Sequence, residues 1–395
     1  MNAGIAYPRG HAGPARDLFA RRVMGPLIFW LILLVLLVYA LILLRYDLRS
    51  YALLMRFANP QASSPLLRFE TYPVTTEDVS IPVENLVIPA RLYLPVGVTH
   101  PGGMVAVHGI HHLGMDEPRL VSFARAVAGS GLAFLTPQVD SLADYRVDAT
   151  SIPVIGDSAI WLDNRLGNHG VTVAGISFAG GLALLAAKQP QYAPHIRALV
   201  LMGAYDDLAR VSRFLATGQQ EMPDGRIESH PAHDYGASVF VYAHLNQFFP
   251  TGDLAVAHDA LRYWLWEQPD KAKPLLAQLS PASRATMDAL LNRRIDEVRP
   301  QILNAIHTDE AELSALSPHG QMDGLDVPVY ILHGAEDNII PPAESLWLKK
   351  DLPEGDVRDV LITGAFSHVD PEKDPSVGEE LRLVRFIGGV LREAN

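Results

Sequence analysis

Residues 175–181 read Gly-Ile-Ser-Phe-Ala-Gly-Gly, and this stretch decides the fold. It follows the apolar, β-branched run 171–174 and opens the helix-forming run 182–187. A serine between a strand and a helix, with such small neighbours, suits a turn so sharp that larger side chains would not fit. The turn holds the hydroxyl out above the sheet edge. We therefore predict that Ser177 is a nucleophile, although a serine at a strand–helix junction is also a common helix cap.

Composition narrows the classes of function. The chain has 395 residues, about half of them apolar, which is enough for one large domain or two smaller ones. Its formal net charge of -12 argues against a nucleic-acid partner, because phosphate binding needs clustered lysine and arginine. The absence of cysteine excludes disulfides, cysteine-ligated zinc, iron–sulfur clusters and a cysteine nucleophile.

A hydrophobic segment near the amino terminus predicts a membrane anchor. Residues 25–44 carry no charge and consist mainly of Leu, Ile and Val. At about 1.5 Å per residue they span roughly 30 Å, the thickness of a hydrocarbon core. Trp30 and Tyr46 lie near the ends, where amphipathic aromatic residues anchor. The run ends in a poor signal-cleavage site, so we expect one transmembrane helix over residues 25–45, with residues 25–44 in contact with the bilayer.

The orientation of this anchor follows from the flanking charges. Basic residues before the span exceed those after it, and the positive-inside rule then favours a cytoplasmic amino terminus. The single-pass chain would carry its main domain outside the cytoplasm. The charges that decide this are Arg9, Arg16, Asp17, Arg21 and Arg22 before the span and Arg45, Asp47, Arg49 and Arg56 after it.

Beyond the anchor, strand and helix patterns alternate. We expect a disordered tail over 1–24 and a linker over 46–74. An α/β core follows, in two parts over 75–207 and 323–395, and a helical insertion without strands separates them over 208–322. Continuous apolar strands between helices indicate a mostly parallel sheet covered on both faces. The predicted strands are 79–83, 86–94, 104–107, 133–136, 171–174, 198–202, 327–332 and 357–362, and the predicted core helices are 118–128, 156–166, 182–187, 343–350 and 375–392.

Two further residues complete a catalytic set. A serine hydroxyl attacks an ester only when a histidine takes its proton and a carboxylate orients that histidine. Asp337 lies in the turn after strand 327–332, and His368 lies in the loop after strand 357–362. Both follow the carboxyl ends of parallel strands, where open α/β sheets place their sites.

These motifs resemble the α/β-hydrolase fold of the esterase or lipase type. The strand–Gly-x-Ser–helix elbow at Ser177, the His-Gly-x-x-Asp turn ending at Asp337 and the Ser-His turn at His368 occur in the family's order. The usual elbow has glycine where Ala179 stands. The resemblance implies that Ser177 is the nucleophile, His368 the general base and then acid, and Asp337 the orienting carboxylate. It also implies that residues 208–322 form a helical cap.

The family also implies where the oxyanion is held. The backbone N–H of Phe178, at a helix start, is one expected donor. The second is expected from the loop after strand 104–107, which begins His108-Gly109-Ile110. Ile110 is our candidate, and His111 is the next.

Other assignments remain possible at two places. Asp206 or Asp207, after the preceding strand, rivals Asp337 as the triad acid, and we favour Asp337 because its motif is more complete. A metal site is the other reading of the histidine-rich loop. Adjacent histidines in a loop point in different directions and no second carboxylate follows at ligand spacing, so we expect no metal and a structural role for His108. The residues concerned are His108, His111, His112 and Asp116.

The sequence thus predicts a membrane-anchored serine hydrolase that cleaves a small-molecule carboxylic ester without cofactor or metal. Aromatic residues in 240–249 and 261–266 are expected mainly in the core of the cap, with a few lining a pocket for an apolar acyl chain or an aromatic group. A peptidase- or dienelactone-hydrolase-like enzyme with the same triad is one alternative. A non-catalytic binding scaffold is another. Families with an aspartate nucleophile are disfavoured because Ser177 occupies that position.

Overall fold

The computed structural model describes residues 1, 15–167, 170–365 and 376–395, and an eight-stranded sheet is their core. The strand order is β1-β2-β4-β3-β5-β6-β9-β10. The six strands from β4 to β10 are parallel, and β1 and β2 add an antiparallel hairpin at one edge. This confirms the mostly parallel sheet. The strands are β1 Val74–Val83, β2 Leu86–Pro95, β3 Gly103–Val107, β4 Ala133–Pro137, β5 Val171–Ile176, β6 Ile196–Met202, β9 Val329–Gly334 and β10 Val357–Thr363.

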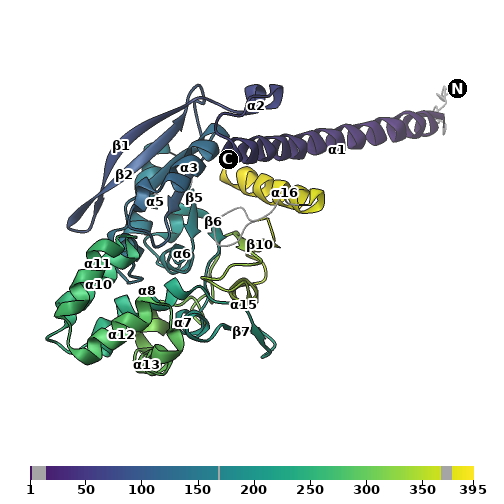
Figure 1. The fold of residues 1–395 in the computed structure, drawn as a ribbon. Coiled ribbons are helices and arrows are strands. Elements are labelled where there is room, and N and C mark those ends of the chain that lie inside the picture. Colours follow the sequence, from purple (N-terminus) through teal and green to yellow (C-terminus); the bar gives the residue numbers. More distant parts are fainter. Residues whose placement is uncertain (2–14, 168–169, 366–375) are drawn as a thin grey trace.

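Helices cover both faces of this sheet, as the continuous apolar strands predict (Figure 1). Alternate side chains of each strand enter two different cores. On β3, Val105 and Val107 pack on the side of α5 and α6, whereas Met104 and Ala106 pack on the side of α3 and α16. The core helices are α3 Pro118–Gly129, α4 Asp140–Ala143, α5 Ser151–Leu166, α6 Ala179–Ala187, α15 Ala343–Asp351 and α16 Val377–Ala394.

The insertion stands over the carboxyl ends of the strands. The Tyr145 hydroxyl, after β4, donates to the Leu265 carbonyl at 2.8 Å, and the His233 N–H donates to the carbonyl of Asn338, after β9, at 2.8 Å. Its helices are α7 Leu208–Thr217, α8 Asp234–Ala243, α9 Leu245–Phe248, α10 Leu254–Leu265, α11 Pro269–Leu275, α12 Pro281–Leu291, α13 Ile295–Thr308 and α14 Glu310–Ala315.

The expectation of a strand-free insertion is wrong at one point. Gln219–Glu221 (β7) and Ile227–Ser229 (β8) pair as a small antiparallel hairpin. Its turn holds Gly225 at a φ of +84°, a left-handed conformation that glycine adopts without strain. The strands are too short and too polar for their pattern to stand out in the sequence.

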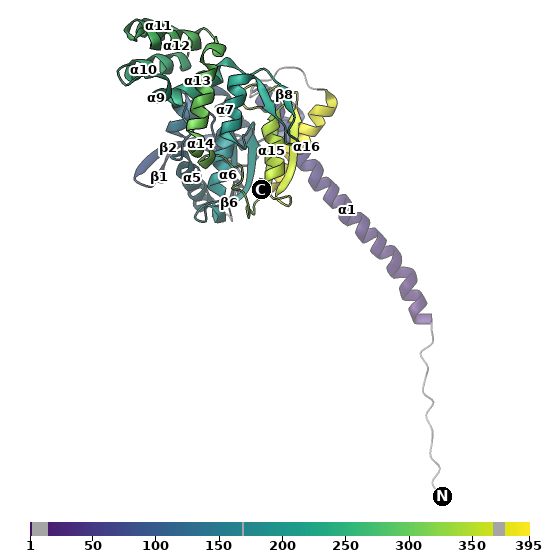
Figure 2. The ribbon, with the colours of Figure 1, turned by 90° about the horizontal axis from the view of Figure 1, so that it is seen from below.

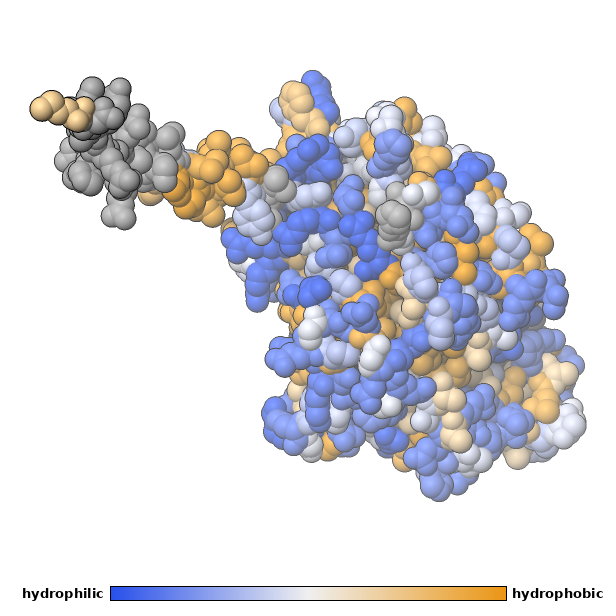
Figure 3. All heavy atoms as spheres, turned by 180° about the vertical axis from the view of Figure 1, so that it is seen from behind, coloured by the Kyte–Doolittle hydropathy of each residue, from blue (hydrophilic) through white to orange (hydrophobic). Residues whose placement is uncertain are grey.

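The amino-terminal helix α1 runs from Ala15 to Ala58 and is long and apolar enough to cross a bilayer over Ile28–Ala58. Signal sequences and buried core helices also meet this criterion. In α1, however, large apolar side chains from Ile28 to Leu41 are exposed, and Figure 3 shows this part standing out from a largely hydrophilic surface.

Helix α1 is longer at both ends than the segment that the hydropathy predicts. It includes residues 15–24, expected in a disordered tail, and residues 46–58, expected in a linker. Residues 2–14 of that tail lie outside the described residues. The second extension has a physical reason: Ser50, Ala52 and Leu53 are buried against the core domain, so tertiary packing stabilises the helix there.

The carboxyl-terminal end of α1 (residues 46–58) contacts α16, which lies beside it in Figures 1 and 2, and also α3 (Figure 1). Gly388 of α16 allows the approach, because a Cβ at this position would lie 2.7 Å from the Asp47 carboxylate and 3.4 Å from the Tyr46 carbonyl carbon. On the other side, the Phe57 ring meets the Phe123 ring of α3 edge to face at 5.7 Å. The helix is therefore part of the domain.

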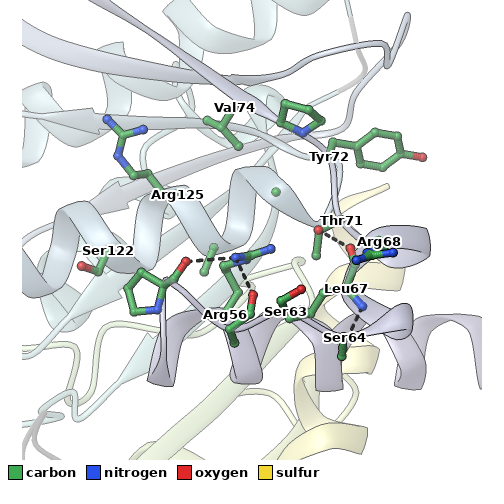
Figure 4. A pocket seen from close by; sticks show the side chains of 15 residues that line it. Arg56, Ser63, Ser64, Leu67, Arg68, Thr71, Tyr72, Val74, Ser122 and Arg125 are labelled. Carbon is green, nitrogen blue, oxygen red and sulfur yellow. Dashed lines mark hydrogen bonds between the residues drawn. The ribbon is translucent and has the colours of Figure 1, made fainter.

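The chain after α1 is fixed as well, around a cavity of about 440 Å³ (Figure 4). Arg56 donates to the carbonyls of Pro60 at 2.9 Å and Ala62 at 3.1 Å, which closes the turn after α1. Ser64 accepts from the Leu67 N–H at 3.2 Å and caps the short helix α2 Pro65–Glu70. Much of the expected linker is thus folded onto the domain.

Replacing Gly388 with valine should separate α1 from α16. The added isopropyl group would overlap the Asp47 carboxylate and crowd the backbone of α1, and such overpacking destabilises by about 1–3 kcal/mol. Thermal unfolding of the full chain in detergent should show a lower Tm. Gly378→Val is the matched control, because a Cβ there meets nothing within 4 Å. Equal effects of the two substitutions would contradict the proposed contact.

Candidate active site

Ser177 occupies a strained turn between β5 and α6. Its φ is +57°, a left-handed conformation that is uncommon for residues other than glycine and recurs at functional sites. The Ser177 N–H donates to the Met202 carbonyl at 2.7 Å, and its carbonyl accepts from the Gly180 N–H at 2.9 Å. These two bonds hold the turn between the end of β6 and the first turn of α6.

Glycines around the serine make this turn possible. A Cβ on Gly175 would lie 2.5 Å from the Gly180 Cα, and one on Gly180 would lie 2.3 Å from the Ala204 Cβ. A Cβ on Gly181 would likewise lie 2.3 Å from the Tyr205 ring, so tight approaches fall at positions 175, 180 and 181. Ala179, where the family pattern has glycine, is fully buried in the first turn of α6.

The Ser177 hydroxyl lines a cavity of about 470 Å³. The side chain is only 2% exposed, and within the described residues its Oγ has no hydrogen-bond partner. An unpartnered buried hydroxyl is unfavourable unless another group completes it. The loop after β3 passes beside it, since a Cβ on Gly109 would lie 3.6 Å from the Oγ. The structure thus brings the predicted nucleophile and the predicted oxyanion loop together.

The two predicted oxyanion donors lie on the chain at either side of this hydroxyl. Phe178 directly follows Ser177, and Ile110 lines the same cavity as Ser177. Neither N–H donates a hydrogen bond to any group in the described part of the chain. Among the described residues neither N–H therefore has a protein acceptor, as an oxyanion hole requires.

His108 fixes the loop that carries Gly109 and Ile110. Its Nε2 accepts from the Val139 N–H at 3.0 Å, so the proton must be on Nδ1, which donates to the Gly109 carbonyl at 2.8 Å. Burial lowers the pKa of His108 to about 4, so the ring is neutral at pH 7. These contacts fit the structural role expected from the sequence.

The other histidines of this loop stack on one another. The His111 and His112 rings lie 4.7 Å apart, and His112 stacks on Trp266 of the insertion at 5.9 Å. Asp116 pairs with Arg91 at 2.8 Å. Burial, followed by the neighbouring His112, lowers the pKa of His111. This loop therefore joins the insertion to the sheet by ring contacts.

Asp337 is fully buried in the turn after β9. Its Oδ1 accepts from the N–H groups of Ile339 at 2.9 Å and Ile340 at 3.0 Å. Its Oδ2 lies 3.4 Å from Nε2 of His333, which donates to the Ile340 carbonyl at 2.9 Å. His230 of the insertion contacts the Asp337 carbonyl at 2.8 Å. Sequence reasoning did not identify His230 as a support of this turn, because it becomes a neighbour only through the fold, whereas His333 lies only four residues before Asp337.

The rival acid Asp206 belongs to a separate cluster of charged side chains. It is fully buried, and its Oδ2 accepts from Arg210 at 2.9 Å and lies 3.1 Å from Nδ1 of His319. Arg210 also donates to Glu344 at 2.6 Å, and Glu344 accepts from the N–H of Asp206 at 2.9 Å. Asp207 caps α7 by accepting from the Arg210 N–H at 2.8 Å. This arrangement favours Asp337 as the acid.

Burial and the neighbouring Glu344 raise the pKa of Asp206 to about 7, although Arg210 opposes the shift. Burial opposes a charge on His319, but Asp206 and Asp351 outweigh it and raise the pKa of His319. The cluster is therefore sensitive to pH near neutrality.

His368, the predicted base, lies outside the described residues. The described chain ends before it at Ala365, which follows β10 and lines the Ser177 cavity. β10 pairs with β9 in parallel, with Thr363 opposite Gly334, so this loop leaves the same sheet edge as the Asp337 turn.

The cavity wall is the least predictable part of the site. No residue of the 208–322 insertion lines this cavity in the described structure, contrary to the expectation for its aromatic residues. Phe240, Tyr242, Phe248 and Phe249 are buried in the core that includes the insertion. The wall is formed instead by α1, α3 and α16, through Tyr51, Leu53, Leu54, Met55, Phe57, Ala58, Leu120, Phe123, Glu380, Leu383 and Ile387.

Comparisons with known proteins agree with this fold. The family described as alpha/beta hydrolase fold matches residues 152–371, more than half of the chain. A comparison with curated protein sequences gives no match.

Solved structures with a similar fold include three hydrolases. A hyperthermophilic esterase from the archaeon Pyrobaculum calidifontis is 18% identical, with 88% of each chain covered and a TM-score of 0.46. A 2,6-dihydroxy-pseudo-oxynicotine hydrolase is 14% identical, covering 80% of this chain and 68% of that one, with a TM-score of 0.43. For the Pyrococcus horikoshii acylaminoacyl peptidase the values are 12% identity and a TM-score of 0.44, with 78% of this chain covered. This chain spans only 40% of that peptidase.

The Asp206 cluster predicts a pH-dependent effect of Asp206→Asn. A carboxyl whose pKa is higher in the folded chain contributes stability at low pH, and this contribution is lost as the pH rises through about 7. The raised pKa of His319 likewise contributes stability at low pH that is lost as the pH rises. The loss of unfolding free energy caused by the substitution should therefore shrink between about pH 5 and pH 8.

Denaturant unfolding of both proteins across this pH range measures the difference. Asp207→Asn is the control, because asparagine caps a helix as well as aspartate does, so its effect should not change with pH. A pH-independent effect of Asp206→Asn would contradict the assignment.

Proposed function

Since this chain belongs to the α/β-hydrolase fold family, we propose that it is a serine hydrolase that cleaves a carboxylic ester through an acyl-enzyme. One observation carries the proposal. A serine in a left-handed elbow lines an apolar cavity, and neither its buried hydroxyl nor the two nearby N–H groups have a hydrogen-bond partner among the described residues. A helix-capping serine needs neither the strained φ nor the cavity.

The reaction would proceed in two steps. The Ser177 Oγ attacks the ester carbonyl carbon, and its proton passes to His368. As the tetrahedral intermediate collapses, the bond to the alcohol oxygen breaks and His368 returns the proton to the leaving alcohol. Water then attacks the acyl-enzyme with the same base, which releases the carboxylic acid and restores Ser177.

Strand order supports Asp337 and His368 as the partners of Ser177. Ser177 follows β5 and Asp337 follows β9, with β6 between them. Adjacent strands lie about 4.8 Å apart, so β5 and β9 are separated by about 10 Å, a gap that an imidazole ring fills. His368 comes from the loop after β10, next to β9 on the same sheet edge.

The cavity lining favours an ester over a peptide. Most of the lining side chains are aliphatic, aromatic or methionine, as in Leu54, Phe123, Met202 and Ile387. A peptide would leave backbone N–H and carbonyl groups without partners there, whereas an acyl chain has none to satisfy. No cofactor or metal is needed for this chemistry.

We further propose that α1 is a permanent membrane anchor. A cleaved signal sequence would be lost from the mature protein, whereas α1 continues unbroken from the apolar span into a packed wall of the domain. Flanking arginines favour a cytoplasmic amino terminus, which places the hydrolase domain outside the cytoplasm.

Ser177→Ala should abolish covalent labelling by a fluorophosphonate and lower ester hydrolysis to background. Removing the nucleophile leaves no oxygen to form the acyl-enzyme, and such losses reach about 10⁶-fold in kcat. In-gel fluorescence and a nitrophenyl ester assay on the full chain measure the two effects. Ser158→Ala is the control, because Ser158 also has a buried hydroxyl without a partner among the described residues but lies on α5. Labelling that survives Ser177→Ala would refute the proposal.

The triad acid can be identified by a matched pair of substitutions. Asp337→Asn should lower kcat by about 10³–10⁴-fold, because an amide cannot stabilise the imidazolium that forms on His368. Asp206→Asn should change kcat by far less, since Asp206 serves the Arg210 cluster. Steady-state kinetics near neutral pH compares the two. The opposite ranking would transfer the role to Asp206.

A further inference from the structure

The end of the apolar helix α1 forms one wall of the cavity that holds Ser177. Six residues of α1 between Tyr51 and Ala58 line this cavity, opposite the elbow and the oxyanion loop. α16 closes it from a second side through Leu383 and Ile387. The volume of about 470 Å³ is that of a small-molecule site, and the lining is predominantly apolar.

The charges around the cavity indicate which part of a ligand it holds. Within the described lining, the carboxylates are Glu117 and Glu380, and the only guanidinium is that of Arg119. Arg119 lies 2.7 Å from Glu117 and is therefore partly neutralised. This balance does not favour a phosphate or another anionic headgroup. It favours an uncharged hydrocarbon chain, whose burial is stabilised by the hydrophobic effect.

The same helix relates the cavity to the expected bilayer. The charge-free apolar run of this helix ends at Leu44, and the first lining residue is Tyr51. Seven residues of α-helix correspond to about 10 Å, so the cavity begins about 10 Å beyond the end of the apolar span. α1 and Ser177 line the same cavity, and no residue of the 208–322 insertion lines it in the described structure.

We propose that this cavity is the acyl site, and that the substrate is a long-chain acyl ester whose chain enters from the membrane along α1. The inference rests on the proposed serine hydrolase function. It assigns α1 two roles, as membrane anchor and as a wall that contacts substrate. It also assigns chain-length selection to α1 and α16 rather than to the insertion.

Photocrosslinking on the wild-type protein tests the location of the chain. The full chain in phosphatidylcholine nanodiscs is treated with a long-chain alkyl fluorophosphonate that carries a diazirine at the chain end. The Ser177 Oγ attacks phosphorus, fluoride leaves, and the serine proton passes to the base. Light then expels nitrogen from the diazirine, and the carbene inserts into a neighbouring C–H bond. Mass spectrometry locates both attachments.

Crosslinks within residues 51–58 or 380–387 are the expected result. Crosslinks confined to residues 208–322, with labelling still at Ser177, would overturn the acyl site but leave the proposed hydrolase intact. Absence of labelling at Ser177 would instead overturn the proposed function, and this inference with it.

A pair of substitutions on one helix provides the second test. Leu54→Trp narrows the cavity, and it should lower the ratio of kcat/KM for a long-chain over an acetyl nitrophenyl ester by about tenfold or more, as expected when a pocket loses room for methylene groups. Leu48→Trp is the control, because Leu48 is exposed on the same helix and does not line the cavity. Equal ratios in the two variants would overturn the acyl site.

A kinetic comparison tests whether the ester reaches Ser177 from a bilayer. A monoacylglycerol embedded in nanodiscs is compared with the same ester in detergent micelles, for the full chain. Faster turnover from the bilayer is expected if the chain enters along α1. Equal turnover from both would overturn entry from the membrane.

Discussion

The close packing of backbone against backbone at the elbow is the constraint on which the site depends. Gly175 and Gly180 approach so closely that no side chain fits between them, and this contact holds Ser177 at a positive φ. Residues in such conformations persist only where the surroundings fix them. Here β5, β6 and α6 do so through hydrogen bonds at both ends of the serine. The result is a hydroxyl that the fold has buried without giving it a partner in the described structure.

Hydrogen bonds to backbone groups also fix the two turns beside the elbow, which are the oxyanion loop and the Asp337 turn. His108 holds the oxyanion loop as a neutral ring between two backbone groups. The Asp337 turn is closed by two N–H groups, with His230 of the insertion on its carbonyl. In the Asp206 cluster, Arg210 pairs with both Asp206 and Glu344, and burial together with Glu344 raises the pKa of Asp206. This pairing distinguishes Asp206 from Asp337, the residue proposed as the triad acid.

The sequence predicts the parts of this protein that local rules determine. Glycine spacing identifies the elbow, and runs of buried strand residues identify the sheet, because both signals lie in consecutive residues. The extension of α1 to Ala58 could not be predicted in this way, since it depends on Leu53 packing against a distant helix. For the same reason the sequence predicts insertion residues in the cavity wall, where the structure has residues of α1, α3 and α16. Aromatic residues such as Phe240 show no sequence difference between packing in a core and lining a pocket.

Helix α1 continues from the apolar span into the α/β-hydrolase domain as one unbroken helix. A flexible linker would let an anchored domain take many orientations, whereas a continuous helix would hold the domain in one orientation and at one height above the lipid surface. If α1 is the proposed membrane anchor, encounter would become a two-dimensional search, with a high effective concentration for molecules in the same leaflet and little access to those on distant particles. Rigidity in this connection would act as a filter on substrates before any pocket selects among them.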